Sequence, residues 1–357
     1  MFHINGGNKM RFFDINKISD IHVHMSDSAF NVCENYLDLI YNQGVECAAL
    51  QSLTYRSIYY NLLVLYWKAV YKKLNLSAFG MIHSKPDDIY KDVPFDDQVK
   101  YLLDMGCDGI KLMWAPGLRK EHGHGINDAR YDKMFDYLEE NSIPMVIHVA
   151  DPEDFWVPRE LNETEIERGW GYFLGGFCSK EQLYEETFER LDRNPNLNVS
   201  FAHFFFLSNF MDEAERVFNK YPNVRFDVTP GWEMFLGFSK DIDAWQAFFT
   251  KYGDRILFGT DCSSTKNINP QIYELVKGAL AHSKDEFIMP AYRKLPIKGL
   301  DLDDEVLKKI CCDNYRKFIP CEKKVDVSML KKSAEKMLDD VKGTDDESWL
   351  RELLNRI

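Results

Sequence analysis

Two histidines with a spacing that can bind a metal ion lie near the start of the chain, at His22 and His24. Side chains alternate between the two faces of a strand, so both imidazoles of such a pair point the same way, about 7 Å apart along the strand. Two imidazoles placed like this can hold one divalent ion. The pair alone is weak evidence, because histidines in strands are often structural.

The elements that would position this pair are short apolar runs, each followed by a pattern of helical periodicity. Alternating strands and helices are typical of a parallel sheet, and eight such units favour a closed α/β barrel, the (β/α)8 TIM barrel, over an open sheet. The predicted strands are 18–24, 45–52, 76–83, 109–114, 144–150, 198–204, 223–229 and 255–261. The predicted helices are 28–43, 57–74, 95–106, 128–141, 180–194, 209–221, 240–252 and 270–282.

Three further residues suited to metal binding or proton transfer fall at or near the carboxyl ends of predicted strands. These residues are His148, His203 and Asp261. Barrel enzymes build their active sites at the carboxyl ends of the strands. The sequence therefore predicts that these three residues and the His22–His24 pair line one metal site.

Composition excludes several other classes of protein. The chain has 357 residues and a formal net charge of -13, which argues against a nucleic-acid partner because phosphate binding relies on clustered lysine and arginine. No apolar run is long enough for a membrane span, and the first twenty residues lack the apolar region of a signal peptide. Eight scattered cysteines without a CxxC pair indicate reduced thiols. We expect a cytoplasmic enzyme with a small-molecule substrate.

Two segments exceed what a barrel needs. We expect the insertion 151–179, between the fifth strand and the following helix, to cover the site. Residues 321–357 predict a C-terminal extension of two amphipathic helices beyond a catalytic domain at 1–320. The extension could pack on the barrel or form the contact between copies in a homo-oligomer.

Five short motifs resemble the amidohydrolase superfamily, most closely the amidohydrolase-2 branch. That branch includes aminocarboxymuconate semialdehyde decarboxylase and related metal-dependent hydrolases. The matching motifs are DIHVH (20–24), GIKLM (109–113), VIHVAD (146–151), FAHF (201–204) and LFGTD (257–261). The resemblance spans roughly residues 18–320.

The resemblance implies a divalent ion, most often zinc and sometimes manganese. Its ligands would be His22, His24, His148 and Asp261, while His203 would either bind a second ion or orient the attacking water and the substrate. Lys111 is ambiguous: in members with two ions a lysine at this place carries a carboxylate and bridges them. Lys111 could instead bind a substrate carboxylate as a cation, or pack its stem in the barrel.

The favoured function is hydrolysis of a small, acidic lactone, ester or amide by a metal-activated water. Asp261 would take the proton from the water, and His203 would stabilise the developing oxyanion. One alternative is non-oxidative decarboxylation within the same branch. Others are a phosphoesterase of the polymerase and histidinol phosphatase type, and a barrel that binds metal without catalysis.

Aromatic and basic residues around the expected mouth of the barrel are candidate substrate contacts. Aromatic plates and guanidinium groups suit a planar or sugar-like acid, although the aromatics could equally anchor the insertion to the barrel. The predicted substrate-binding residues are Lys111, Trp114, Trp156, Arg159, Arg168 and Trp232.

Overall fold

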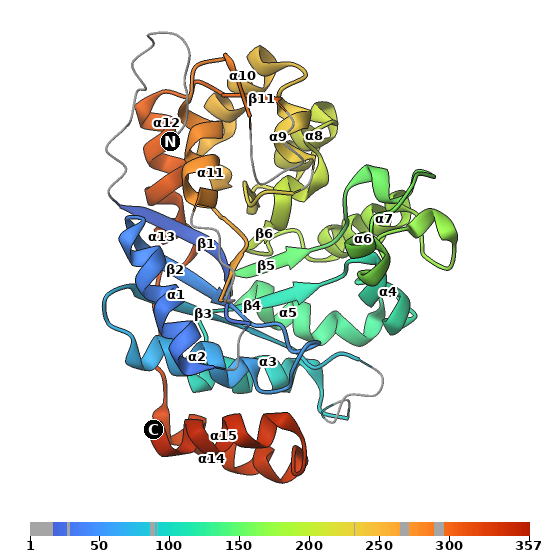
Figure 1. The fold of residues 1–357 in the computed structure, drawn as a ribbon. Coiled ribbons are helices and arrows are strands. Elements are labelled where there is room, and N and C mark those ends of the chain that lie inside the picture. Colours follow the sequence, from blue (N-terminus) through green and yellow to red (C-terminus); the bar gives the residue numbers. More distant parts are fainter. Residues whose placement is uncertain are drawn as a thin grey trace.

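The computed structural model describes residues 17–26, 29–85, 90, 92–231, 233–264, 271–288 and 296–357. Parallel strands form one sheet that curls around a central axis, with helices on its outer side (Figure 1). The strands are β1 (Ile18–His24), β2 (Val45–Gln51), β3 (Asn75–Met81), β4 (Gly109–Met113), β5 (Met145–His148), β6 (Val199–Phe201), β7 (Val224–Asp227), β8 (Ile256–Leu257) and β9 (Cys262–Ser263).

The sheet closes on itself between β1 and the segment that joins β8 to β9. The strand order runs from β8 through β7 to β1 and ends at β9, and β8 and β9 are neighbours in sequence. Three backbone hydrogen bonds make the closure: Ile21 N donates to Phe258 O (3.0 Å), Asp261 N to His22 O (2.8 Å) and Ser264 N to His24 O (3.0 Å). The prediction of a TIM barrel is confirmed.

The helices follow the predicted pattern, and no helix end differs from its predicted position by more than four residues. The outer helices are α1 (Phe30–Asn42), α2 (Tyr60–Val70), α3 (Phe95–Met105), α5 (Asp132–Glu140), α7 (Lys180–Arg193), α8 (Met211–Lys220), α10 (Ile242–Tyr252) and α11 (Gln271–Ala281). Three short helices were not predicted: α4 (Pro116–His122), α6 (Glu163–Glu167) and α9 (Met234–Phe238). At five to seven residues, they are too short to show a 3.6-residue period.

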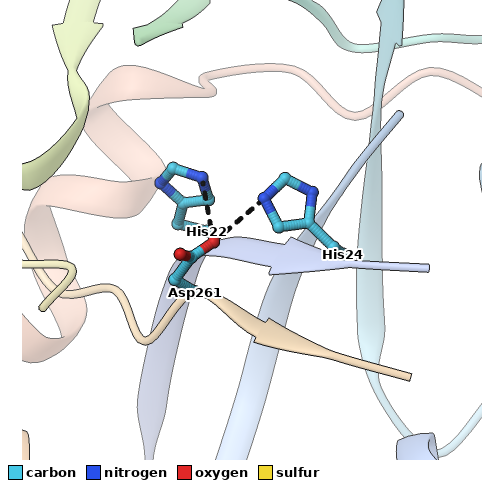
Figure 2. Close-up of side chains that lie close together, drawn as sticks. All are labelled: His22, His24 and Asp261. Carbon is cyan, nitrogen blue, oxygen red and sulfur yellow. Dashed lines mark ion pairs between the residues drawn. The ribbon is translucent and has the colours of Figure 1, made fainter. Parts of the chain in front are cut away.

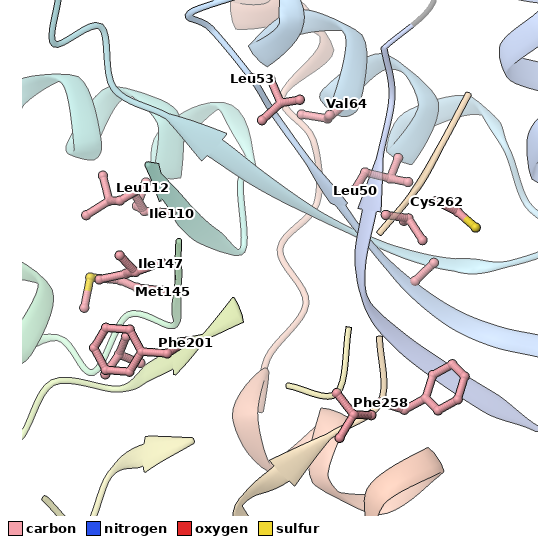
Figure 3. Close-up of a cluster of buried hydrophobic side chains, with 14 of the residues drawn as sticks. Leu50, Leu53, Val64, Ile110, Leu112, Met145, Ile147, Phe201, Phe258 and Cys262 are labelled. Carbon is pink, nitrogen blue, oxygen red and sulfur yellow. The ribbon is translucent and has the colours of Figure 1, made fainter. Parts of the chain in front are cut away.

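Alternation along the strands separates an outer hydrophobic layer from the barrel interior. Figure 3 shows part of the outer layer, which includes from β4 and β5 the side chains of Ile110, Leu112, Met145 and Ile147. Because neighbouring residues in a strand face opposite sides, Lys111 and His148 point into the barrel. A smaller buried cluster fills the interior with Ile21, Cys47, Ala49, Phe79, Val146 and Leu257.

The C-terminal extension packs against the outside of the barrel. After α12 (Asp304–Lys308) and α13 (Asn314–Phe318), the helices α14 (Val327–Asp340) and α15 (Asp345–Arg356) form a hairpin beside α2 and α3 (Figure 1). Asp326 N donates to Met105 O (3.0 Å), and the hydroxyls of Tyr101 and Ser333 are 2.6 Å apart. Among the described residues, no helix combines the length and apolar character needed to cross a bilayer.

Candidate metal centre

Three ligand atoms converge at the carboxyl end of β1. Figure 2 shows His22 and His24 on that strand facing Asp261, which follows β8. The Nε2 atom of His24 lies 3.1 Å from Oδ1 of Asp261, and Nε2 of His22 lies 3.7 Å from it. Ligand atoms bound to one tetrahedral ion at about 2.0–2.1 Å stand about 3.3 Å apart. The three residues therefore form a possible metal site.

The histidines of this region are oriented through contacts of their Nδ1 atoms. Nδ1 of His24 donates to Gln51 O, and Nδ1 of His203 donates to Thr229 O, both at 3.2 Å. A carbonyl oxygen can only accept, so in both rings the proton sits on Nδ1 and the lone pair on Nε2. Nδ1 of His22 likewise faces a carboxylate oxygen of Asp227 at 3.2 Å. Such contacts orient metal-binding imidazoles.

Burial keeps these imidazoles neutral. Burial lowers the pKa of His22 well below its usual value, lowers the pKa of His24, and lowers the pKa of His203 to about 4. Burial acts to raise the pKa of Asp261, but its neighbours His24, His22 and His203 outweigh burial and hold that pKa below its usual range. Neutral imidazoles and an ionised carboxylate are the forms that bind a metal ion.

The other predicted metal-site residues adjoin this group. The ring of His203 lies 5.6 Å from that of His22, and the ring of His148 lies 4.8 Å from that of His203. Nε2 of His148 faces Oδ1 of Asp151 at 3.3 Å. The tight group of three ligand atoms does not include His148 or His203, and their roles stay predictions.

Lys111 reaches the centre from β4. Its side chain is fully buried, and its Nζ lies 3.1 Å from Nε2 of His22. Burial lowers the pKa of Lys111 to about 8, against the opposing charges of Asp261 and Asp227. All three interpretations of Lys111, as a carboxylated bridge, as a cation for a substrate carboxylate and as a stem packed in the barrel, stay predictions.

His203 lies in a left-handed turn that the sequence did not predict. The predicted strand 198–204 ends at Phe201, and residues 203–206 all have positive φ, between 52° and 56°. Four successive non-glycine residues in this region cost about 1–2 kcal/mol each. The side chains of Phe204, Phe205 and Phe206 are almost fully buried, and their packing offsets that cost. The turn directs His203 toward His148 instead of along the strand.

Most of the residues predicted to contact the substrate instead contact other residues of the protein. Trp114 is 1% exposed and packs on His122 and Tyr131. The side chain of Trp156 donates to Cys178 O at 3.0 Å, which ties down the insertion 151–179. These contacts favour an anchoring role for the aromatic residues.

The basic residues of the insertion are likewise engaged within it. Arg159 pairs with Glu165 at 3.0 Å, while the exposed Arg168 lies over the ring of Trp170.

A hollow of about 540 Å³ lies on the insertion. It is lined by Asn162, Glu163, Thr164, Glu165 and Trp170, which are not metal-site residues. Trp232 lies outside the described residues.

Two buried carboxylates that support the centre were missed by sequence reasoning. Asp227, at the end of β7, also accepts from His203 N at 2.9 Å. Asp20 accepts from His22 N (2.9 Å), from the hydroxyl of Thr260 (2.6 Å) and from the hydroxyl of Tyr273 (2.8 Å). The available signal was an acidic residue inside an otherwise apolar strand, since buried carboxylates need partners.

Comparisons with solved structures show the same fold. An uncharacterized TIM-barrel protein from Bordetella bronchiseptica is 15% identical, with 85% of this chain and 98% of that chain covered and a TM-score of 0.52. An amidohydrolase II is 13% identical, covering 85% and 100%, with a TM-score of 0.53. The IDCase of Metarhizium anisopliae is 12% identical, covering 85% and 97%, with a TM-score of 0.54. No curated protein matches the chain.

A comparison with family models identifies the family of this chain. The amidohydrolase model matches residues 91–320, a range that contains Lys111, His148, His203 and Asp261. His22 and His24 lie before the matched range, and the structure brings them to the same end of the barrel. By this match, the chain belongs to the amidohydrolase family.

Proposed function

We propose that this protein is a metal-dependent hydrolase of a small, acidic lactone, ester or amide. The observation that carries the proposal is the convergence of His22 Nε2, His24 Nε2 and Asp261 Oδ1 at the carboxyl end of β1. Two imidazole nitrogens and a carboxylate oxygen are donors that suit zinc, our first choice, and also manganese. A divalent ion held there would acidify a water molecule and polarise a carbonyl group.

The residues around the ion would bind the substrate and move the proton. Asp261 keeps 41% of its side chain exposed, so its free oxygen can accept a proton from water and return it to the leaving group. His203 presents Nε2 beside His22 and would orient the water or the developing oxyanion. His148 would complete the ligand set from β5.

Lys111 supports a second candidate, non-oxidative decarboxylation. A buried amine 3.1 Å from a metal-site imidazole is well placed to bind a substrate carboxylate. In a hydrolase with two ions, the same lysine would instead carry a carboxylate group and bridge them. The chemical state of Lys111 therefore separates the two candidates.

The first test measures the metal content per chain on protein prepared without chelator. It also measures the mass of the intact chain and the electron density at the Lys111 side chain. About two ions and a lysine heavier by one carboxylate favour a hydrolase with two ions, and a screen of lactones, esters and amides should then find a substrate. One ion and an unmodified lysine favour a screen of acidic aromatic substrates for decarboxylation as well. If reconstituted protein binds no ion, the proposal is wrong.

A substitution at Asp261 then tests the mechanism. We expect Asp261→Asn to fold and to lose turnover by orders of magnitude, because an amide cannot accept the proton. Turnover equal to that of the wild type would remove Asp261 from the mechanism.

A further inference from the structure

The last helix of the chain contacts the loops that leave the metal-binding end of the barrel. Trp349, in α15, is 3% exposed. Its ring stacks on Tyr59 at 4.1 Å with an interplanar angle of 20°, and on Phe30 at 5.5 Å with an angle of 6°. Tyr59 precedes α2, and Phe30 is the first residue of α1. One side chain therefore bridges the segments that follow β1 and β2.

Two more contacts fasten α15 to the same segments. Ser57 Oγ donates to Asp346 Oδ2 at 2.8 Å, and the guanidinium of Arg356 lies 4.4 Å from the ring centroid of Phe30. These contacts lie at the two ends of α15, with Trp349 between them. The helix is therefore held along its length and not only at one point.

A chain of direct contacts runs from Trp349 to the candidate metal ligands. Tyr59 packs edge-on against Tyr60 at 5.0 Å, and the Tyr60 hydroxyl donates to Ser26 O at 2.9 Å. Ser26 stands two residues after His24, and its backbone N donates to Ser264 Oγ at 2.9 Å. Ser264 stands three residues after Asp261, and its backbone N donates to His24 O.

This arrangement gives the extension a role in pre-organising the site. Metal affinity falls when ligands must be ordered on binding, and supporting contacts that hold the ligands beforehand reduce that cost. Among the described residues, the pairing of β1 with β9 ends at His24 and Ser263. Stacking by Trp349 restrains the segments that follow β1 and β2 from outside the barrel, and the Tyr60 and Ser26 hydrogen bonds connect this restraint to Ser264 at the end of β9.

We propose that Trp349 is a positioning residue, and that α15 holds the ends of β1 and β9 in the geometry that binds the metal ion. The inference rests on the proposed metal centre and extends it to a part of the chain that lies outside the residues matched by the family model. It predicts that the C-terminal hairpin is needed for tight metal binding as well as for stability.

The experiment compares three variants of the full chain: Trp349→Ala, Trp349→Phe and Leu330→Ala. Leu330 is fully buried near the start of α14, next to the contact between Asp326 and Met105, so its truncation weakens the hairpin at a different place. Zn²⁺ affinity is measured by chelator competition, and amide hydrogen exchange is measured in peptides that contain Ser26 and Tyr60.

We expect Trp349→Ala to weaken Zn²⁺ affinity about tenfold or more and to speed exchange in both peptides, as loss of a supporting contact does at other metal sites. Trp349→Phe should keep most of the affinity because it still stacks. Leu330→Ala should lower the unfolding temperature and keep the affinity. Equal affinity losses in Leu330→Ala and Trp349→Ala, or none in Trp349→Ala, would overturn the inference. A wild-type chain that binds no Zn²⁺ would overturn the metal centre itself.

Discussion

Asp227 and His22 are 205 residues apart in the chain, and Oδ2 of Asp227 lies 3.2 Å from Nδ1 of His22. The other oxygen of Asp227 accepts from the backbone N of His203 and of Thr229. One buried carboxylate thus orients a candidate metal ligand from β1 and fixes the turn that carries His203. Carboxylates in this position set the tautomer and raise the basicity of a metal-binding imidazole.

We predict that Asp227→Asn weakens metal affinity about 10–100-fold, because an amide NH₂ facing Nδ1 favours the wrong tautomer of His22. Chelator competition measures the change. Asp108→Asn is the matched control: Asp108 is also buried, but it pairs with Lys68 at 2.6 Å beside the opposite end of β4. The control should lose stability and retain affinity, and equal affinities in the two variants would contradict the assignment.

Metal removal should lower the stability of the wild-type chain. An ion that binds only the folded state stabilises it by about 2.7 kcal/mol when its free concentration is one hundred times its Kd. We expect Zn²⁺ to raise the unfolding temperature and a chelator to reverse the rise, as measured by calorimetry. His24→Ala should abolish the Zn²⁺ response. His124→Ala, in the loop after α4, should respond like the wild type; loss of its response would place the site elsewhere.

The left-handed turn predicts a reversed preference between glycine and alanine. Phe205 (φ 54°) and Phe201 (φ -87°) stack on each other at 4.0 Å, so both truncations open the same packed region. At Phe201, alanine should be more stable than glycine by about 0.5–1 kcal/mol. At Phe205, glycine should be the more stable by about 1 kcal/mol, because it adopts positive φ without strain. Urea unfolding of the four variants tests this; the same order at both positions would contradict it.

Glu233 should make stability depend on pH. Burial raises the pKa of Glu233 from 4.5 to about 7, against the attraction of Lys180, and its Oε2 is buried without a hydrogen-bond partner among the described residues. The folded chain therefore keeps a proton that the unfolded chain releases first. The contribution of Glu233 to the free energy of unfolding should therefore fall as pH rises from about 4.5 to 7 and then level off.

Glu233→Gln should remove that fall, so the variant gains about 1–3 kcal/mol over the wild type at pH 8 and almost nothing at pH 4. Urea unfolding at both pH values measures the difference. Glu305→Gln, at a side chain that is 83% exposed, is the control and should change stability by less than about 0.5 kcal/mol. A gain at Glu233 that is the same at pH 4 and pH 8 would contradict the shifted pKa.

Local pattern was enough to predict the barrel and the principal residues of the site. Strand periodicity and the alternation with helices identified all eight strand–helix units, and position at strand ends selected His22, His24 and Asp261. These signals are local because the face of a strand on which a side chain lies depends only on its place in the strand. The family match to residues 91–320 agrees with the resemblance carried by the short motifs.

Other features could not be predicted because they depend on contacts between distant segments. No local pattern shows that Asp227 contacts His22 or that Trp349 stacks on Tyr59. The left-handed turn at His203 is locally unfavourable and exists because aromatic packing from other elements offsets its cost.

The barrel, the family resemblance and the strand ends at which metal-binding residues stand follow from the amino-acid sequence, because periodicity and strand position are properties of a short stretch of chain. Three other features depend on the folded chain: which imidazole nitrogens face inward, which carboxylates support them, and the packing of the C-terminal helix beside the loops of the site. Those features require the closed barrel, since hydrogen bonds and ring contacts form only where folding brings distant residues within a few ångströms.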